Sequence, residues 1–264
     1  MSRLSDAWDT EAKVWESFAE SPDNYYSKRT RLVADIILKN VQDRGKAVDG
    51  GCGVGLLSLT LARNGFDIYG YDVSSKMIIY TRRRLVRELD IDPERFRVCH
   101  DEEIPFDSIK FKIITGLDLF PYVKNHDLYI KKLSKFLEVG GYIIASCNNR
   151  YSLYNYISII KHIFRLGRIS NWRSTLINLL RTAYWSGGCL DYKTSKQAYT
   201  AKRFDRFFHR NGFSNIDELN LYAIPYFDQH PLNRSSLGNF LARNLGWQHI
   251  GVYQKLCQPQ SGRS

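Results

Sequence analysis

The stretch that most constrains the fold of this 264-residue chain is AVDGGCGVGLLSLTLA, at positions 47–62. It begins with apolar residues, continues with glycines at alternate positions 51, 53 and 55, and ends with apolar residues at helical spacing. This pattern predicts a strand, a glycine turn and a helix. Glycine suits such a turn because it adopts positive φ and lets the backbone pass close beneath a ligand. The helix start beyond it offers free N–H groups, so the stretch predicts a ligand-binding turn.

The glycines match neither common nucleotide-binding pattern. The dinucleotide fingerprint G-x-G-x-x-G, counted from Gly51, requires glycine at its sixth position, where the chain has Leu56. The lysine of a P-loop is also absent. The next predicted strand, over 67–71, is followed by Asp72. A carboxylate at that strand end is placed to accept both ribose hydroxyls of a nucleoside. The alternative interpretation is that Asp72 is the N-cap of the following helix.

Four motifs, in this order, make the sequence similar to the class I S-adenosylmethionine-dependent methyltransferases, in the branch of ubiquinone, menaquinone and small-molecule enzymes. They are VDGGCGVG at 48–55, YDVSSKMI at 71–78, DEEIPF at 101–106 and FKIITGLDLFPYV at 111–123. The resemblance is strong over 45–147 and continues in weaker pieces to 256. One departure is Lys112, where the family usually carries aspartate at a position that faces away from the cofactor.

The resemblance implies a Rossmann-like α/β fold, with a seven-stranded, mostly parallel sheet, an antiparallel edge hairpin, helices on both faces and a helical lid insertion. The implied cofactor is S-adenosylmethionine. The residues implied to bind it are Gly51, Gly53 and Gly55 beneath the amino-acid end, Asp49 at the loop and the ammonium group, Asp72 at the ribose, Val73 and Met77 at the adenine ring, Asp101 and Glu102 at the adenine amino side, and Leu117 near the methionine portion.

The alternation of strand and helix patterns also predicts a parallel sheet with right-handed crossovers. We expect strands at 46–49, 67–71, 96–99, 111–116, 142–147, 217–223 and 250–256, and helices at 5–20, 28–40, 55–63, 74–89, 126–137 and 200–211, with Gly140-Gly141 ending the helix at 126–137. The chain is predicted to be a single domain with a helical cap at 1–44, a cofactor-binding core at 45–147, a helical lid at 148–200 and the rest of the sheet at 201–264.

The catalytic residues are less evident than the cofactor site. In methyl transfer the protein mainly binds, aligns and desolvates the reactants, although a hydroxyl acceptor usually needs a base. The candidates are Tyr122, His126 and His230, and a structural role is the simpler interpretation of each. Near the N-terminus, residues 25–29 include two tyrosines and Arg29, which we consider for the cofactor's carboxylate or the substrate. The sequence predicts no metal site.

The charge balance bears on the partner. The chain has 38 Lys and Arg against 27 Asp and Glu, a net charge of +11, which indicates either an anionic partner or a solubilising surface. Enzymes that methylate base amino groups hold a flipped base with an Asn/Asp-Pro-Pro-aromatic stretch, and the chain has GLDLFPY at 116–122 instead. We therefore expect methyl transfer to a hydroxyl or amine of a small molecule, such as a metabolite, a sugar or a lipid-linked acceptor. The alternatives are an RNA methyltransferase and a non-catalytic scaffold.

The stretch 150–190 has six Arg and Lys, no Asp or Glu, and many aromatic and aliphatic residues. Three interpretations are open: a lid packed on the core, a site for an anionic or lipid-linked acceptor, or a peripheral membrane contact. No run of 18 apolar residues predicts a transmembrane helix, and the first residues have no apolar signal core. With five widely spaced cysteines read as reduced thiols, we expect a cytoplasmic protein.

Overall fold

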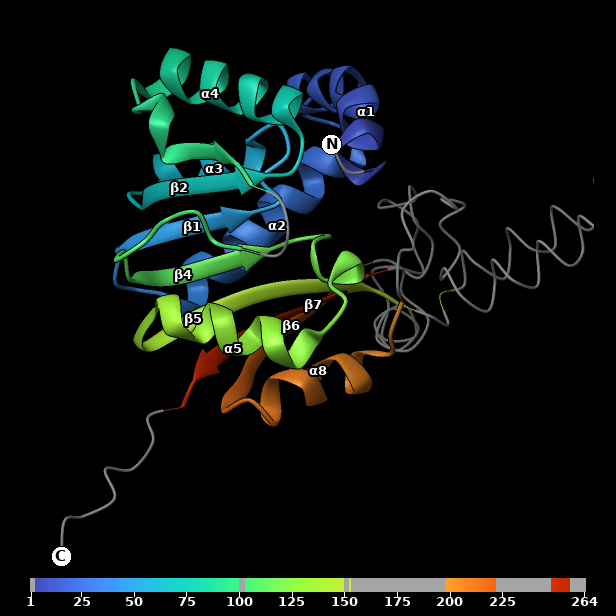
Figure 1. Cartoon of the computed structure of the whole chain (residues 1–264), viewed down its shortest axis with the longest axis vertical. Helices are drawn as coiled ribbons and strands as arrows, with labels where there is room; N and C mark the ends of the chain where they lie inside the picture. Colours follow the sequence, from blue (N-terminus) through green and yellow to red (C-terminus); the bar gives the residue numbers. More distant parts are fainter. Residues whose placement is uncertain (1–2, 100–102, 150–151, 153–197, 222–247, 257–264) are drawn as a thin grey trace, which may run out of the picture.

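A computed structural model describes residues 3–99, 103–149, 152, 198–221 and 248–256 of the chain (Figure 1). Within these ranges the strands form one seven-stranded sheet in the order β3-β2-β1-β4-β5-β7-β6. The strands are β1 (Lys46–Gly50), β2 (Asp67–Asp72), β3 (Phe96–Val98), β4 (Phe111–Gly116), β5 (Leu137–Asn148), β6 (Phe213–Leu221) and β7 (Gln248–Lys255). The first five run parallel, and β7 is antiparallel to both β5 and β6. The predicted mostly parallel sheet with an antiparallel edge hairpin is confirmed.

Helices cover both faces of this sheet, as predicted. Figure 1 shows α5 and α8 on one face and α2 and α3 on the other. The described helices are α1 (Arg3–Glu20), α2 (Tyr25–Asn40), α3 (Leu56–Arg63), α4 (Ser75–Leu89), α5 (His126–Phe136) and α8 (Ala201–His209), with 3₁₀ turns η1 (Pro93–Arg95) and η2 (Phe120–Tyr122). Within the described ranges, none of these helices is both long and apolar enough to cross a bilayer.

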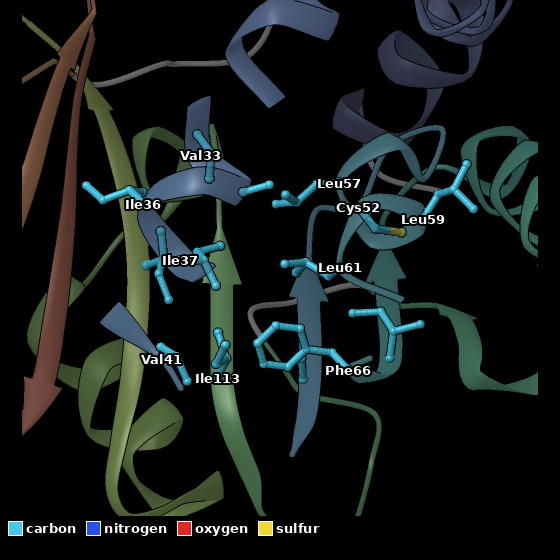
Figure 2. Close-up of a cluster of buried hydrophobic side chains, with 14 of the residues drawn as sticks. Val33, Ile36, Ile37, Val41, Cys52, Leu57, Leu59, Leu61, Phe66 and Ile113 are labelled. Atoms are coloured by element: carbon cyan, nitrogen blue, oxygen red, sulfur yellow. The ribbon is translucent and has the colours of Figure 1, made fainter. Parts of the chain in front are cut away.

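The core has two layers because successive residues of the central strands face opposite sides of the sheet. Ile113 of β4 belongs to the cluster under α2 and α3, and its neighbour Ile114 belongs to the cluster under α5. Figure 2 shows Ile37 of α2 and Leu61 of α3 gathered with Ile113. All four side chains are at most 1% exposed, and burying each contributes about 1.5–3 kcal/mol. The central strands read as nearly continuous apolar runs because both of their faces are covered.

Helix α1 is attached to the first turn of α4. The carboxylate of Asp9 accepts hydrogen bonds from the hydroxyls of Ser74 and Ser75 and from the N–H of Lys76. A second contact joins Glu16 to Arg84 at 2.7 Å. A carboxylate at a helix N-terminus is favourable because it meets free N–H groups and the positive end of the helix dipole. The two contacts hold α1 along α4, one at the first turn of α4 and one at Arg84 further along it.

Several boundaries differ from the sequence-based expectation. Helix α2 begins at Tyr25 rather than at 28, because Asn24 caps it. Helix α5 ends at Phe136 and β5 begins at Leu137, so Gly140-Gly141 is not a turn that ends the helix but part of the strand. The register with β4 shifts there, and Gly140 has φ +69°, a conformation that glycine adopts readily in a bulge. Strand β6 begins at Phe213, before the predicted start at 217, and is bulged between Asn215 and Asp217.

Most of the predicted helical lid at 148–200, namely residues 150–151 and 153–197, lies outside the described residues, and so does the stretch 222–247. The division of the chain into cap, core, lid and C-terminal part therefore stays a prediction. At the start of β4, Lys112 lies 3.4 Å from the carboxylate of Asp43. This is the end of the strand opposite to the one at which the glycine turn lies.

Candidate functional site

The glycine turn follows β1 and is held by the neighbouring strand β2. The N–H groups of Gly51 and Cys52 both donate to the carbonyl oxygen of Tyr71, at 2.8 and 3.1 Å. Gly51, Gly53 and Gly55 have φ of +67°, +55° and +79°, a region that residues with a Cβ rarely adopt. The conformation of the turn alone therefore favours glycine at the three positions.

The glycines differ in what lies beside them. A Cβ at Gly55 would lie 2.8 Å from Cγ2 of Thr81, so this glycine allows α3 to pack closely on α4. A Cβ at Gly53 would meet nothing nearer than the hydroxyl of Tyr26, at 4.0 Å. A Cβ at Gly51 would lie 3.7 Å from the Cβ of Leu119, in ordinary van der Waals contact with the loop after β4. The backbone at Gly53 is thus left open for a ligand to approach.

Asp49, near the end of β1, is a buried anchor of the turn. Its two carboxylate oxygens accept hydrogen bonds from the hydroxyls of Thr115 on β4, at 2.6 Å, and Ser58 on α3, at 2.7 Å. Burial raises the pKa of Asp49, and the two hydroxyl donors oppose that shift. The side chain joins β1, β4 and α3 around the turn.

Asp72 ends β2 directly beside the turn. Its Oδ2 accepts from the N–H of Gly53 and its Oδ1 from the N–H of Ser74, both at 2.9 Å. The N-cap of α4 is Ser74, whose hydroxyl accepts from the N–H of Met77 at 3.1 Å, so the alternative interpretation of Asp72 as the cap is wrong. Burial raises the pKa of Asp72 to about 6, against the hydrogen bonds from Ser74 and Gly53. A backbone hydrogen bond from Val73 acts in the same direction as these two, and the carboxylate keeps lone-pair capacity for a ligand.

A buried polar cluster, which the sequence did not predict, lies where β4, β5 and β7 meet. Asp118, with φ +58° after β4, pairs with the guanidinium of Arg29 on α2 and accepts from the side-chain amide of Gln248 on β7. The Asp118 N–H donates to the hydroxyl of Ser146 at 2.8 Å. Burial alone would lower the pKa of Arg29, but the Asp118 charge raises it. The guanidinium therefore stays charged.

Two polar atoms near this cluster are buried and have no hydrogen-bond partner among the described residues: Nε of Arg29 and Oδ1 of Asn148. Buried polar atoms are normally satisfied, so each can serve a ligand. Sequence analysis singled out Arg29 but missed the partners because 130 positions separate Gln248 from Asp118. The sequence held only a weak signal for these partners. They lie at strand ends, on the edge of the sheet where α/β proteins bind ligands.

The remaining predicted cofactor residues have varied surroundings. Met77 is buried in a small cluster with Val54 and Ala12, so part of its side chain packs against α1. Val73 and Leu117 are half-buried at the ends of β2 and β4. Asp101 and Glu102 lie outside the described residues.

Of the two catalytic candidates that the structure describes, His126 is the more enclosed. Its ring stacks on Phe207 with centroids 4.6 Å apart, and its Nε2 lies 3.1 Å from the carbonyl oxygen of Phe120. Burial lowers the pKa of His126 to about 4, so the ring is neutral at pH 7 and can donate to that carbonyl. Tyr122 is half-buried in η2 and meets the ring of Trp8 edge-on at 6.2 Å. His230 lies outside the described residues.

The sheet order, the glycine turn and the carboxylate at the end of β2 define a class I S-adenosylmethionine-dependent methyltransferase. The chain matches the family described as methyltransferase domain over residues 25–218, and it belongs to that family.

Curated relatives and solved structures agree with this assignment. The chain is 30% identical over 146 residues to a ubiquinone biosynthesis O-methyltransferase of Pelagibacter ubique; the match covers 52% of this chain and 59% of the relative. The chain thus spans about three fifths of the curated relatives that it matches. The structure is similar to magnesium protoporphyrin IX methyltransferase from Synechocystis with bound SAH. The TM-score is 0.62 at 16% identity, and the match covers 96% of this chain and 98% of that one. The [4+2]-cyclase SpnF gives the same TM-score of 0.62 at 15% identity, and the match covers 98% of this chain and 97% of the cyclase. At these identities the structures show a shared fold.

Proposed function

We propose that this protein binds S-adenosylmethionine at the carboxyl ends of β1, β2 and β4 and transfers its methyl group to a hydroxyl or amine of a small molecule. The observation that carries the proposal is the open, positive-φ glycine turn, whose Gly53 N–H is held by the Asp72 carboxylate. The family membership supports it. The name of the relatives, O-methyltransferase, favours an oxygen acceptor.

When bound, the cofactor supplies a methyl carbon activated by its sulfonium, so the protein's part is to bind, align and exclude water. Asp72 would accept the ribose hydroxyls through its remaining lone pairs. The backbone at Gly51 and the open backbone at Gly53 would lie beneath the amino-acid end, with Asp49 holding the turn. The Nε–H of Arg29, which has no acceptor among the described residues, would donate to the cofactor's carboxylate.

The other cofactor contacts rest on the family resemblance alone. Val73 and Met77 would line the adenine, Asp101 and Glu102 would serve its amino side, and Leu117 would lie near the methionine portion. For a hydroxyl acceptor, we favour Tyr122 over His126 as the group near the reacting oxygen. Nε2 of His126 already hydrogen-bonds to the carbonyl oxygen of Phe120, and the ring stacks on Phe207.

The acceptor is proposed to be anionic or lipid-linked because the stretch 150–190 is basic, aromatic and free of acidic residues. A membrane-surface role predicts salt-sensitive co-sedimentation with vesicles that contain anionic lipid, since each basic residue near the surface contributes about 1 kcal/mol. If the protein stays in the supernatant at low salt, the membrane role fails. If Arg165→Glu with Arg168→Glu also leaves turnover intact, an anionic-acceptor role for this stretch fails too.

Cofactor binding is tested by calorimetry with S-adenosylhomocysteine, the demethylated product. Asp72→Ala should weaken binding by about 1.5–3 kcal/mol because it leaves ribose hydroxyls without their acceptor. The matched control is Asp67→Ala at the other end of β2, where the carboxylate pairs with Arg95; its affinity should be unchanged. Unaltered affinity in Asp72→Ala would overturn the assignment of this site.

Methyl transfer needs its own test, because the fold is shared with a cyclase. The protein is incubated with methyl-labelled cofactor and extract fractions containing metabolites, lipids or RNA. We expect label in a small molecule or a lipid fraction. Label in RNA would support the nucleic-acid alternative, and cofactor binding without label in any fraction would favour a scaffold.

A further inference from the structure

A second cluster of charged side chains lies between α8 and the β6–β7 hairpin, away from the glycine turn. Asp205 comes from α8, Glu218 from β6 and His249 from β7, and their potential ligand atoms all lie within 4.8 Å of one another. Figure 1 shows α8 on the same face of the sheet as α5. His249 is 2% exposed, so this is a buried imidazole between two carboxylates.

The hydrogen bonds around His249 indicate which ring nitrogen carries a proton. Nδ1 lies 2.9 Å from the side-chain oxygen of Asn220, while the amide nitrogen of Asn220 donates to Glu218 at 3.1 Å. The amide orientation assigned from this contact makes Nδ1–H the donor to Asn220. Nε2 then faces Oδ1 of Asp205 at 3.3 Å. In a neutral ring, two acceptors would face each other there, so the geometry needs a cation between them, either a proton or a metal ion.

The separation between the His249 and Asp205 side chains fits a metal ion. Two ligands bound to Zn²⁺ at about 2.0–2.1 Å with tetrahedral angles lie about 3.3–3.4 Å apart, and the Nε2–Oδ1 separation is 3.3 Å. A metal-binding histidine usually donates its other N–H to a neighbouring oxygen, as His249 does to Asn220. Histidine nitrogen with carboxylate oxygens is a ligand set suited to Zn²⁺ and similar divalent transition metals.

The surroundings of Asp205 are also arranged around its carboxylate. The hydroxyl of Tyr253 donates to Oδ1 at 2.6 Å, and the amide of Asn215 donates to the same oxygen at 3.1 Å. Tyr253 reaches it by lying across Gly251, where a Cβ would be 2.3 Å from the tyrosine hydroxyl.

We propose that Asp205, Glu218 and His249 form a site for one divalent transition-metal ion of the Zn²⁺ class, with water completing the coordination. The ion holds the edge hairpin against α8. It also restrains the start of β7, where Gln248, the residue before His249, hydrogen-bonds to Asp118 on the opposite face of the sheet. The site is independent of the proposed methyl transfer, and its test uses no cofactor.

The test is a titration of the untagged, chelator-treated full chain with Co²⁺ and Zn²⁺. We expect one Co²⁺ per chain with the visible absorption of a tetrahedral nitrogen and oxygen site, displaced by Zn²⁺. Glu218→Gln and His249→Gln should each weaken the affinity at least about tenfold. His209→Gln, an exposed histidine on the same helix, should bind as the parent protein does.

Absence of stoichiometric binding in the parent chain would overturn the proposal and leave His249 and Asp205 as a proton-bridged pair. Should His249→Gln fail to fold by circular dichroism, Glu218→Gln decides, since Glu218 is only half-buried. Zn²⁺ should raise the melting temperature of the parent and of His209→Gln but not that of Glu218→Gln. Equal affinity in Glu218→Gln and the parent would also overturn the site.

Discussion

At the scale of single residues, Asp72 links burial to cofactor affinity. The pKa of this carboxyl is about 6 in the folded protein against a usual 3.8, so between about pH 4 and 6 the folded state holds more protons than the unfolded one. In that window the contribution of Asp72 to folding stability falls as the pH rises. The ionised form, however, is the better acceptor for ribose hydroxyls, so acid should oppose cofactor binding.

We therefore expect the affinity for S-adenosylhomocysteine to fall as the pH is lowered through 6, by up to about tenfold per pH unit. Binding near pH 6 should release protons, which calorimetry in buffers of different ionisation enthalpy measures. Asp72→Asn should abolish the dependence and Asp67→Asn should retain it. A pH-independent affinity in the parent protein would contradict the assignment of Asp72 to the ribose.

The glycines of the turn give a second prediction at this scale. Gly53→Ala adds backbone strain of about 1–2 kcal/mol at positive φ, with nothing nearer to the new Cβ than the Tyr26 hydroxyl at 4.0 Å. Gly55→Ala adds the same strain and also a clash with Thr81, which costs about 1–3 kcal/mol more. In urea unfolding, Gly55→Ala should be the less stable variant. In calorimetry, Gly53→Ala should show the larger loss of cofactor affinity per kcal/mol of lost stability. If Gly55→Ala instead showed the larger loss of affinity per kcal/mol of lost stability, the space beside Gly53 would not be used by a ligand.

At the scale of elements, α1 depends on its contact with the start of α4. Burial raises the pKa of Asp9, but the hydrogen bonds from Ser74, Lys76 and Ser75 outweigh it and lower the pKa, so the ionised carboxylate is the stabilising form. Asp9→Ala should lower the free energy of unfolding by about 0.5–2 kcal/mol, measured in urea. Glu11→Ala, an exposed position on the same helix, should change it by less than about 0.5 kcal/mol. Equal effects would show that α1 is held by its apolar contacts alone.

Elements were predictable from the sequence wherever a local pattern specifies them. The strands that contain Val48 and Ile114 are apolar runs followed by turns, and the helix after Ser74 has a strong N-cap. The boundary at Leu137 was not predictable, because the pairing of this residue with Phe111 starts β5 early and the bulge at Gly140 absorbs the difference. Register with a distant strand, not local preference, decides such a boundary.

At the scale of the whole molecule, ligand binding should distinguish this site from other nucleotide sites. Cofactor product at about 100 times its Kd stabilises the folded state by about 2.7 kcal/mol, and each kcal/mol raises the melting temperature of a protein of this size by about 2–4 °C. NAD and ATP should give no shift, because the chain has neither phosphate-binding pattern. A shift with either nucleotide equal to that with S-adenosylhomocysteine would contradict the proposed ligand.

The part of the site formed by neighbouring segments of the sequence was predictable. Gly51, Gly53 and Gly55 lie in a single motif, and Asp72 follows the next strand. The cluster around Asp118 was not predictable, because α2, β5 and β7 each contribute one partner and only the folded sheet brings them together. Residues joined by long-range pairing have no common local pattern in the sequence.

The position of β7 has a consequence for the order in which the protein can assemble during synthesis. Among the described strands β7 comes last in the chain, yet it lies between β5 and β6. A ribosome that has released everything up to residue 247 has therefore delivered β6 without its neighbour and left one edge of β5 uncovered. Unpaired strand edges invite association between nascent chains. Assembly of the described sheet thus ends with insertion of an inner strand, and before that insertion the uncovered edges are open to association with other chains.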